Sequence, residues 1–279
     1  MPELPEVETV VGDLAESGLE GRTILRARVY WPRSVEGMTP AAFRDRLRNR
    51  RIERIRRRGK YIVMVVGGGW HLLIHLRMSG RLFFAPRAEP RDEHERVVFE
   101  LDDGRTLRFH DTRKFGRITL TMRPQEKLRR LGPEPLEREF TARDFAQRLA
   151  CRKGMLKPLL LNQQIIAGLG NIYVDEALFE ARLHPKRRCS TLTAPELHAL
   201  YRAIRKVLRR GIRASGTTLG AGQANFYSAS GRRGRNQDGL KVFRRTGEPC
   251  PRCGAPIARL VVGQRGTHVC RECQASHDT

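Results

Sequence analysis

Long hydrophobic runs are missing from this sequence. Across its 279 residues, no apolar stretch approaches the roughly 18 to 20 residues that a membrane-spanning helix needs. No basic amphipathic helix of the kind that lies on a membrane surface dominates the pattern either. At the start, Glu3, Glu6 and Glu8 stand where a secretory signal peptide carries basic residues. We therefore expect no membrane association, no signal peptide and a cytoplasmic location.

Acidic residues are scarce relative to basic ones. The chain has 54 Lys and Arg against 30 Asp and Glu, which gives a net charge of +24 and a pI of about 11.1. Such an excess favours a polyanionic partner, and nucleic acid is the leading candidate. The hydrophobic fraction of 39% suffices for ordinary cores, and the length suits two modest domains with one small module.

Cysteine is rare before the C-terminal thirty residues. Only Cys151 and Cys189 precede the last four cysteines, and we expect both to be unpaired thiols. The last four follow a C-x2-C-x16-C-x2-C pattern, which is typical of a zinc ribbon. Each C-x2-C pair supplies two thiolates to a tetrahedral ion, so no position is left open for catalysis. The sequence predicts one structural Zn²⁺ and a hairpin between the pairs. His268 and His277 could compete as ligands, but a position on the solvent side is favoured for both. The predicted ligands are Cys250, Cys253, Cys270 and Cys273.

Short β-rich runs dominate the first half of the chain. Glycine and aspartate turn signals separate them, as at 67–69 and 102–104. Before them, apolar residues at helical spacing predict one helix over 6–16. The first domain is therefore predicted to be a β-sandwich or barrel with an N-terminal helix. The expected strands cover residues 61–66, 72–76, 81–84, 97–101 and 106–109.

Helical periodicity replaces this pattern after the Gly-Pro-Glu-Pro stretch at 132–135. The second domain is predicted to be helical throughout, and a capping box from Thr193 to Glu196 opens its longest helix. The segment 216–239 is rich in Gly, Ser, Asn and Arg without apolar periodicity, which predicts a mobile loop. The expected helices cover residues 143–149, 158–162, 171–180 and 193 to about 210.

The N-terminus carries a candidate nucleophile. Once the initiator Met is cleaved, Pro2 presents a secondary amine whose pKa of about 7.7 to 8 leaves a useful fraction unprotonated at neutral pH. Such an amine can attack an electrophilic carbon and form a Schiff base, and the carboxylate of Glu3 follows it directly. Lys60 enters an apolar strand after Gly59, where partial desolvation would lower the pKa of its amine and suit it to proton transfer.

Six motifs occur in order along essentially the whole chain and together carry a family resemblance. Taken alone, the glycine-bearing stretch 168–171 is compatible with either a phosphate site at a helix start or simple turn chemistry. The motifs are Pro2–Thr9, Gly59–Tyr61, His75–Gly80, Asp111–Gly116, Gly168–Tyr173 and the cysteine ribbon. In this combination the sequence closely resembles formamidopyrimidine-DNA glycosylase, the bacterial 8-oxoguanine repair enzyme family.

The resemblance implies an α+β multidomain fold with DNA in a cleft between domains. The expected parts are an N-terminal β-sandwich domain over 1–130, a helix-two-turn-helix domain over 131–226 and a C-terminal zinc finger over 240–279. The expected partner is damaged double-stranded DNA, bound by a monomer. A bacterial cytoplasmic protein, associated with the nucleoid through DNA binding, is the expected setting.

The resemblance also implies roles for individual residues. Pro2 matches the nucleophile that attacks C1′ of the damaged nucleotide, and Glu3 matches the acid/base that assists sugar opening. Lys60 matches the proton donor associated with β-elimination, and Arg265 matches the one associated with δ-elimination. Side chains that enter the duplex where a base has left compensate for lost stacking, and the matching residues are Met78, Arg113 and Phe115. The residues that match phosphate contacts are His94, Lys114, Lys153 and Asn171.

The predicted function is that of a base-excision-repair DNA glycosylase and AP lyase. It would remove oxidised purines and then cleave the strand by β,δ-elimination. One alternative is the sister enzyme endonuclease VIII, which prefers oxidised pyrimidines, although Leu4 and the residues at 5–9 favour the purine enzyme. The other alternative is a non-catalytic zinc-ribbon protein that binds nucleic acid. It would leave four residues without a role, which are Pro2, Glu3, Lys60 and Arg265.

Overall fold

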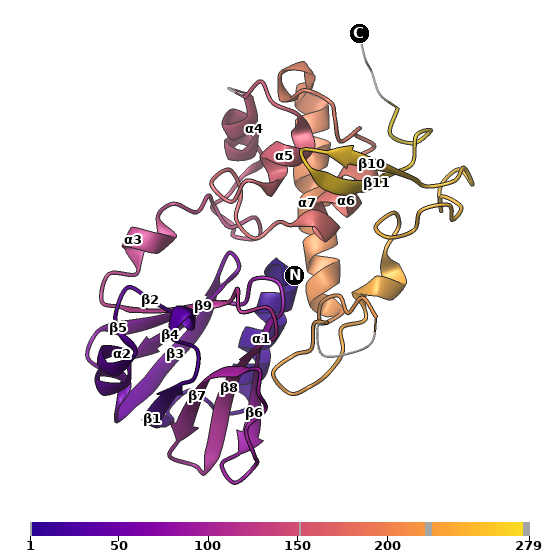
Figure 1. Cartoon of the computed structure of the whole chain (residues 1–279). Coiled ribbons are helices and arrows are strands. Elements are labelled where there is room, and N and C mark those ends of the chain that lie inside the picture. Colours follow the sequence, from indigo (N-terminus) through magenta and orange to yellow (C-terminus); the bar gives the residue numbers. More distant parts are fainter. Residues whose placement is uncertain (1, 151, 221–224, 276–279) are drawn as a thin grey trace. The chain divides into compact units, whose positions relative to one another are not determined.

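The computed structural model describes residues 2–150, 152–220 and 225–275 and divides into two compact units (Figure 1). The first unit contains residues up to 129 together with 212–237, and the second contains 130–211 together with the chain from 238 onward. Each unit is thus assembled from two separate stretches of sequence. Within the described residues, no helix is both long enough and apolar enough to cross a bilayer.

The first unit is built on strands that form two hydrogen-bonded groups. One group has the order β2-β9-β5-β4-β3, and the other has the order β1-β7-β8-β6. In the described chain the groups are joined where Thr23 and Ile24 of β1 pair with Arg51 and Arg50 of β3. The strands are β1 (Thr23–Val29), β2 (Val35–Glu36), β3 (Arg50–Arg58), β4 (Tyr61–Val66), β5 (Trp70–His75), β6 (Gly80–Pro86), β7 (Glu95–Leu101), β8 (Arg105–Asp111) and β9 (Arg117–Thr121).

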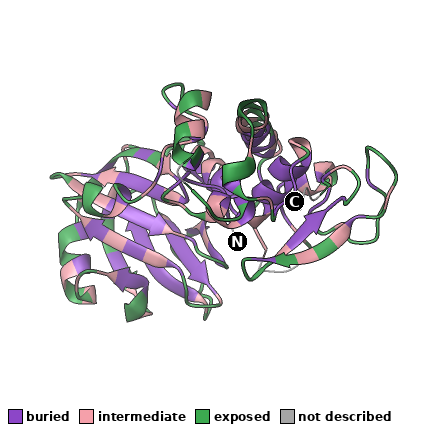
Figure 2. Ribbon diagram, turned by 90° about the horizontal axis from the view of Figure 1, so that it is seen from above, coloured by how far each residue is buried: buried purple, intermediate pink, exposed green. Residues whose placement is uncertain are grey.

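Side chains from both strand groups fill a single core. In Figure 2 much of the ribbon of these strands is coloured as buried. Residues two apart on a strand share one face, and Ile62, Met64 and Val66 of β4 are accordingly buried together. Helix α1 (Leu4–Glu16) adds further apolar side chains, including Val10, to the same core. The predicted β-sandwich with an N-terminal helix is therefore confirmed.

A second helix in this unit, α2 (Pro40–Leu47), was not expected from the strand-like pattern around it. It begins where the Thr39 hydroxyl accepts the Ala42 N–H at 3.2 Å, with proline at the first helical position. The helix buries Phe43 and Leu47 in the sandwich core. A short helix α3 (Gln125–Leu128) and a 3-10 turn η1 (Pro32–Ser34) complete the regular elements of this unit.

The second unit is helical and carries a β-hairpin near the C-terminus, as predicted. At its longest helix, the Thr193 N–H donates to the Glu196 carboxylate at 2.8 Å, and the Glu196 N–H donates to the Thr193 hydroxyl at 3.4 Å. The expected capping box is therefore present. The elements are α4 (Ala142–Ala150), α5 (Leu156–Leu161), α6 (Asn171–Glu180), η2 (Cys189–Thr191), α7 (Ala194–Arg213), η3 (Asn236–Gly239), β10 (Ala258–Val262) and β11 (Arg265–Val269). Of these, the C-terminal end of α7 and the start of η3 fall within the first unit.

The segment 216–239, predicted to be mobile from its composition, is tied to α1 at several described positions. The Thr217 N–H donates to the Glu6 carboxylate at 2.8 Å. The Asp13 carboxylate accepts the Ser230 N–H at 2.9 Å and the Arg232 guanidinium at 2.5 Å. Phe226 and Ala229 also pack on the sandwich core. Isolated apolar residues and hydrogen bonds hold this segment, so its sequence carries no regular hydrophobic pattern. Residues 221–224 lie outside the described residues.

Candidate active site and nucleic-acid interface

Pro2 and Glu3 lie buried at the start of α1 in the first unit. Glu3 is the N-cap of this helix, and its backbone N–H donates to the Glu6 carboxylate at 2.8 Å. The second oxygen of the same carboxylate accepts the Thr217 N–H at 2.8 Å. The single Glu6 side chain therefore fixes the backbone beside the candidate nucleophile, and it also holds the segment 216–239. Met1, whose removal the Schiff-base hypothesis requires, lies outside the described residues.

Lys60 is buried in the turn between β3 and β4. Arg57 stabilises this turn, because its guanidinium donates to the Gly59 carbonyl at 3.1 Å and contacts the Glu8 carboxylate of α1 at 2.5 Å. Burial, with the charges of Arg77 and Lys60 nearby, lowers the pKa of His75 to about 3. His75 is thus neutral at physiological pH, and its Nδ1 accepts the Arg77 N–H at 3.0 Å.

Two loops that carry the candidate wedge residues are joined by the buried carboxylate of Asp111. One oxygen accepts the Ser79 hydroxyl at 2.5 Å and the Arg113 N–H at 3.2 Å. The other oxygen accepts the Gly116 N–H at 2.6 Å. Ser79 belongs to the loop between β5 and β6, whereas Arg113 and Gly116 belong to the loop between β8 and β9. The Asp111 carboxylate therefore holds together two loops that are distant in sequence.

The side chains at the tips of these loops are exposed and apolar. Met78 retains 42% of its surface exposed and Phe115 retains 47%. Arg77 and Lys114, which directly precede them, adopt left-handed backbone conformations with φ of 55° and 60°. Non-glycine residues adopt this conformation rarely, and such strain is concentrated at functional sites.

The predicted cationic residues near these tips contact aromatic rings. The Arg113 guanidinium lies 5.0 Å from the centre of the Phe115 ring. The Lys114 ammonium lies 4.3 Å from the centre of the Trp31 ring. Cation–π contacts of this kind orient long side chains while leaving the charge accessible.

His94 precedes β7 in the same unit and is partly exposed. Its backbone N–H donates to the Asp92 carboxylate at 2.7 Å, and its Nδ1 lies 3.2 Å from the Arg96 guanidinium. Arg96 in turn donates to the Asp111 carbonyl at 2.8 Å. The His94 segment is thus linked through Arg96 to the Asp111 loops.

In the second unit, a buried ion pair holds the hairpin that carries Arg265. The Lys157 ammonium of α5 lies 2.5 Å from the Asp175 carboxylate of α6, and neither side chain is exposed. The other Asp175 oxygen accepts the His268 N–H at 2.9 Å. The Gly266 carbonyl accepts from Lys157 at 3.1 Å and from the Asn171 amide at 3.0 Å. Asn171, predicted to contact phosphate, therefore also fixes the backbone next to Arg265.

The remaining predicted positions differ in their surroundings. Arg265 is exposed at the first residue of β11, after a turn at Gly263 and Gln264. Lys153 is exposed between α4 and α5. The prediction that His268 lies on the solvent side was wrong: only 8% of it is exposed, because its ring packs against Phe243 and contacts Asp175.

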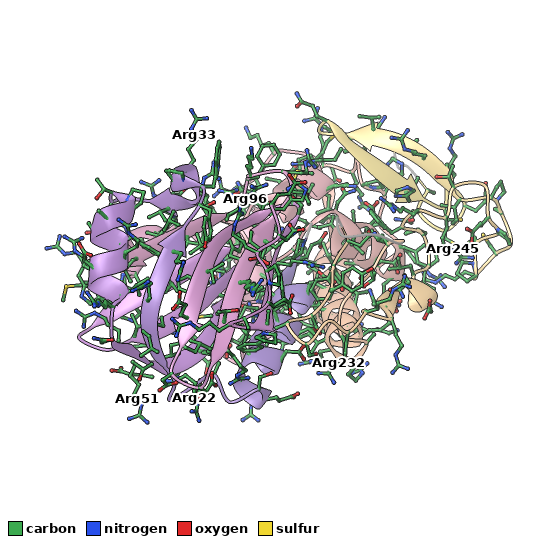
Figure 3. All side chains as sticks on the ribbon, turned by 60° about the horizontal axis from the view of Figure 1, so that its bottom comes forward. Arg22, Arg33, Arg51, Arg96, Arg232 and Arg245 are labelled. Carbon is green, nitrogen blue, oxygen red and sulfur yellow. The ribbon has the colours of Figure 1, made fainter. Side chains whose placement is uncertain are left out.

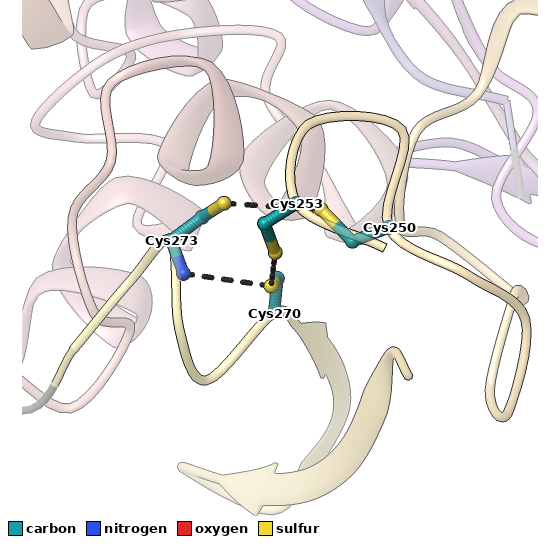
Figure 4. Close-up of side chains that lie close together, drawn as sticks. All are labelled: Cys250, Cys253, Cys270 and Cys273. Atoms are coloured by element: carbon teal, nitrogen blue, oxygen red, sulfur yellow. Dashed lines mark hydrogen bonds between the residues drawn. The ribbon is translucent and has the colours of Figure 1, made fainter. Parts of the chain in front are cut away.

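The four predicted zinc ligands converge beside the hairpin (Figure 4). Their Sγ atoms all lie within 4.8 Å of one another, and the pairs Cys250–Cys273 and Cys253–Cys270 are separated by 3.8 and 3.5 Å. Zn–S bonds of about 2.3 Å in a tetrahedron place sulfur atoms about 3.8 Å apart, so the cluster fits one ion.

Cys189 is buried and does not belong to the four-cysteine cluster. Burial raises the pKa of Cys189 to about 11, which leaves it a protonated and unreactive thiol. This agrees with its prediction as an unpaired thiol. Cys151 and His277 lie outside the described residues.

Family comparisons cover nearly the entire chain. Residues 1–118 match the family model of the formamidopyrimidine-DNA glycosylase N-terminal domain. Residues 131–222 match the model of the formamidopyrimidine-DNA glycosylase H2TH domain. Residues 247–275 match the model of a zinc finger found in FPG and IleRS. The formamidopyrimidine-DNA glycosylase of Herpetosiphon aurantiacus is 48% identical over 99% of this chain and 100% of its own. The chain belongs to the formamidopyrimidine-DNA glycosylase family.

Further relatives agree with this membership. The formamidopyrimidine-DNA glycosylase of Protochlamydia amoebophila is 46% identical over 98% of this chain and 99% of its own. A Lactococcus lactis FPG mutant, crystallised with DNA containing Fapy-dG, has a TM-score of 0.91 at 36% identity and covers 99% of this chain and 100% of its own. The Thermus thermophilus MutM (FPG) protein has a TM-score of 0.87 at 40% identity, with 98% of each chain covered.

Within the formamidopyrimidine-DNA glycosylase family fold, the cysteine cluster is a structural zinc site. The zinc-finger model spans all four cysteines, and they occupy every ligand position of a tetrahedral ion. The finger is fixed to α6, since the Arg252 guanidinium donates to the Phe179 carbonyl at 2.6 Å and lies 4.3 Å from the centre of that residue's ring. When bound, the ion supplies folding energy rather than reactivity.

Several residues that organise these sites were given no role from sequence. Glu6 and Asp111 lie within two of the six family motifs, and Asp175 lies two residues after a third. Only Glu6 had a readable signal, because Glu3 and Glu6 have the i, i+3 spacing of a capping box. Asp111 and Asp175 accept hydrogen bonds from residues far away in sequence, which no local pattern indicates.

Proposed function

We propose that the protein is a bifunctional DNA glycosylase and AP lyase of base-excision repair that removes oxidised purines such as 8-oxoguanine and formamidopyrimidines. The observation that carries this proposal is the buried Pro2-Glu3 start of α1, held by Glu6 in a chain of this family. The DNA-bound Lactococcus lactis relatives, including one with an abasic-site DNA, support damaged duplex DNA as the partner.

In the proposed mechanism, the Pro2 amine bonds to C1′ of the flipped nucleotide while the bond between C1′ and the damaged base breaks, and the departing base takes up the proton that the amine loses. Glu3 donates a proton to the sugar ring oxygen, the ring opens, and the product is an iminium. The iminium withdraws electrons and acidifies the sugar, so the two phosphates leave by successive β- and δ-elimination. Lys60 and Arg265 would supply protons in these steps, and a one-nucleoside gap remains.

The proposed DNA contacts divide into a wedge and a phosphate grip. Met78, Arg113 and Phe115 would fill the space of the extruded base, and their exposure at paired loop tips suits that task. The phosphate grip would come from cations and polar groups on both units, which are His94, Lys114, Lys153 and Asn171. We also propose a monomer, a cytoplasmic setting and association with the nucleoid through DNA binding.

Borohydride trapping tests the proposed chemistry. Protein shown by mass to lack Met1 should form a stable adduct on a duplex with 8-oxoguanine opposite cytosine, and none on an undamaged duplex. Protein that keeps Met1 should form none, because the Pro2 nitrogen is then an amide. Glu3→Gln should lose the adduct on 8-oxoguanine but retain it on a duplex with a preformed abasic site.

Other outcomes separate the alternatives. Trapping on a thymine-glycol duplex in preference to 8-oxoguanine would identify an oxidised-pyrimidine enzyme. Absence of any adduct from Met1-free protein would favour a DNA-binding protein without catalysis. An adduct of equal yield from the Met1-retaining form would show that another amine is the nucleophile.

A further inference from the structure

Arg96 is a buried arginine near the start of β7, two residues after the predicted phosphate contact His94. In Figure 3 the side chains of Arg33 and Arg51 extend from the ribbon, whereas only 7% of Arg96 is exposed. A buried guanidinium is tolerated only when its N–H groups find acceptors. The acceptors of Arg96 therefore show which parts of the first unit it holds.

Each guanidinium nitrogen of Arg96 has its own acceptor. Nε donates to the Asp111 carbonyl at 2.8 Å, and Nη1 donates to the Glu93 carbonyl at 2.9 Å. Nη2 lies 3.2 Å from Nδ1 of His94. Because all three nitrogens are engaged within the protein, Arg96 is poorly placed to bind a phosphate itself. An effect of Arg96 on DNA binding would instead act through His94.

The contact with Arg96 determines which nitrogen of the His94 ring carries the hydrogen. A guanidinium can donate but cannot accept a hydrogen bond, so Nδ1 of His94 is the acceptor in this contact. With Nδ1 as the acceptor, the hydrogen of the ring is on Nε2. Nε2 of His94 accordingly presents an N–H group, which can donate to a phosphate oxygen.

The surroundings of His94 hold its ring in this orientation. Its N–H donates to the Asp92 carboxylate at 2.7 Å, and its carbonyl accepts the Asp111 N–H at 2.9 Å. The ring packs against the buried ring of His110, with centres 5.6 Å apart and planes at 88°. Nε2 lies 3.6 Å from the Glu93 carboxylate, whose side chain is 83% exposed. A phosphate that approaches Nε2 would therefore displace only a side chain that can turn into solvent.

We propose that Arg96 is a positioning residue, which fixes the tautomer and the ring orientation of His94 so that its Nε2–H donates to a DNA phosphate. This inference rests on the proposed function, in which His94 contacts the DNA backbone. Arg96 would touch neither the DNA nor the reacting atoms. Since the same guanidinium also holds the Asp111 carbonyl, an effect through the loops that Asp111 joins must be told apart by experiment.

A double-mutant cycle on binding separates these two effects. The ligand is a duplex with a tetrahydrofuran abasic analogue, followed by fluorescence polarisation. Arg96→Met removes the donor and should raise the Kd about tenfold, because a hydrogen bond to a charged phosphate is weakened. His94→Ala should raise the Kd by a similar factor. The double variant Arg96→Met/His94→Ala should bind no more weakly than His94→Ala alone.

Arg105→Met is the matched control for the loss of a guanidinium in this unit. The Arg105 guanidinium also bonds within the unit, to the Asp103 carboxylate at 2.9 Å and the Ser17 carbonyl at 3.0 Å, but these partners are not histidines. Its replacement should leave the Kd unchanged.

Nitrogen-15 NMR of protein with labelled histidine reads the tautomer of His94 directly. In the unaltered chain, Nδ1 should have the shift of an unprotonated acceptor and Nε2 that of an N–H nitrogen. Arg96→Met should move both shifts towards those of a freely exchanging ring, whereas Arg105→Met should not. His94→Gln, whose amide can replace the Nε2–H donor, should recover most of the affinity that His94→Ala loses. The spectrum of the unaltered chain and the His94→Gln variant test the proposal even if Arg96→Met does not fold.

The proposal is overturned if His94 of the unaltered chain carries its hydrogen on Nδ1, or if His94→Ala leaves the Kd unchanged. It is equally overturned if the effects of Arg96→Met and His94→Ala add, since Arg96 would then act through the Asp111 loops. Failure of the proposed function is distinguishable, because the unaltered chain would then form no borohydride adduct on 8-oxoguanine. If that function holds, Arg96→Met should form the adduct at an unchanged rate at saturating protein, and only the half-saturating protein concentration should rise.

Discussion

Lys157 and Asp175 form a buried ion pair in the second unit. Their side chains are fully buried and lie 2.5 Å apart, and through His268 and Gly266 they hold the hairpin that carries Arg265. A buried charge is tolerated only when it is paired, because transfer out of water is costly. Loss of one partner leaves the other uncompensated.

Replacement Lys157→Met should therefore destabilise the second unit by about 3–5 kcal/mol, since Asp175 would remain buried without its cation. The measurement is loss of helical circular dichroism in urea. Lys206→Met provides the matched control, because it removes a lysine–carboxylate pair with Glu180 whose lysine is largely exposed, and a change below about 1 kcal/mol is expected there. Equal losses in the two variants would contradict this account.

At the scale of elements, the hairpin of β10 and β11 is fixed by a close approach at its turn. Gly263 has φ of 54°, and a Cβ at this position would lie 2.7 Å from the Pro158 side chain of α5. Only glycine meets both conditions without a shift of the hairpin.

Gly263→Ala should move the turn away from α5 and displace Arg265, which begins the next strand. If Arg265 assists δ-elimination as proposed, product of β-elimination alone should accumulate on a denaturing gel while base release persists. Gly254→Ala is the control, since Gly254 has φ of 77° with nothing within 4 Å of its added Cβ. An unchanged ratio of the two products in Gly263→Ala would refute the link between the turn and Arg265.

Elements with a strong local signal were predictable, and those held by distant partners were not. The strand at 61–66 and the helix at 171–180 have the predicted bounds, because apolar periodicity and turn residues define them locally. Helix α2 was missed although Thr39-Pro40 is a recognisable helix start. The packing of 216–239 on α1 was missed because Glu6 and Asp13 act over more than two hundred residues.

The residues of the candidate site were likewise predictable only in part. Its chemistry-bearing residues, Pro2 and Lys60 among them, could be selected from motifs, whereas the carboxylates that position them could not. The catalytic and DNA-binding roles stay predictions, as do the domain boundaries 1–130, 131–226 and 240–279.

At the scale of the whole molecule, the zinc ion stabilises one end of the second unit. The cysteine cluster shares a small core with Phe179 of α6 and Val242. A core of this size cannot maintain the finger without its metal, because such modules fold with the ion.

Removal of zinc with a chelator should therefore unfold the finger while the β-sandwich persists. Hydrogen exchange is expected to accelerate at residues 250–273, with little change in β4 and β5 of the first unit. Affinity for a lesion duplex should fall together with this protection, and both should recover on addition of Zn²⁺. Full protection of the finger in metal-free protein would contradict a structural role for the ion.

The discontinuous first unit has a consequence for synthesis of the chain on the ribosome. The carboxylates of Glu6 and Asp13 bind backbone groups that follow them by 211 and 217 residues. At about 5–20 residues per second, each nascent chain waits on the order of ten to forty seconds before these partners are made. During that interval the sandwich has emerged without the hydrogen bonds that the Glu6 and Asp13 carboxylates make to residues 217 and 230. The start of α1 therefore reaches its final geometry only late in translation, so a nascent chain cannot acquire a finished N-terminal site before its C-terminal third exists.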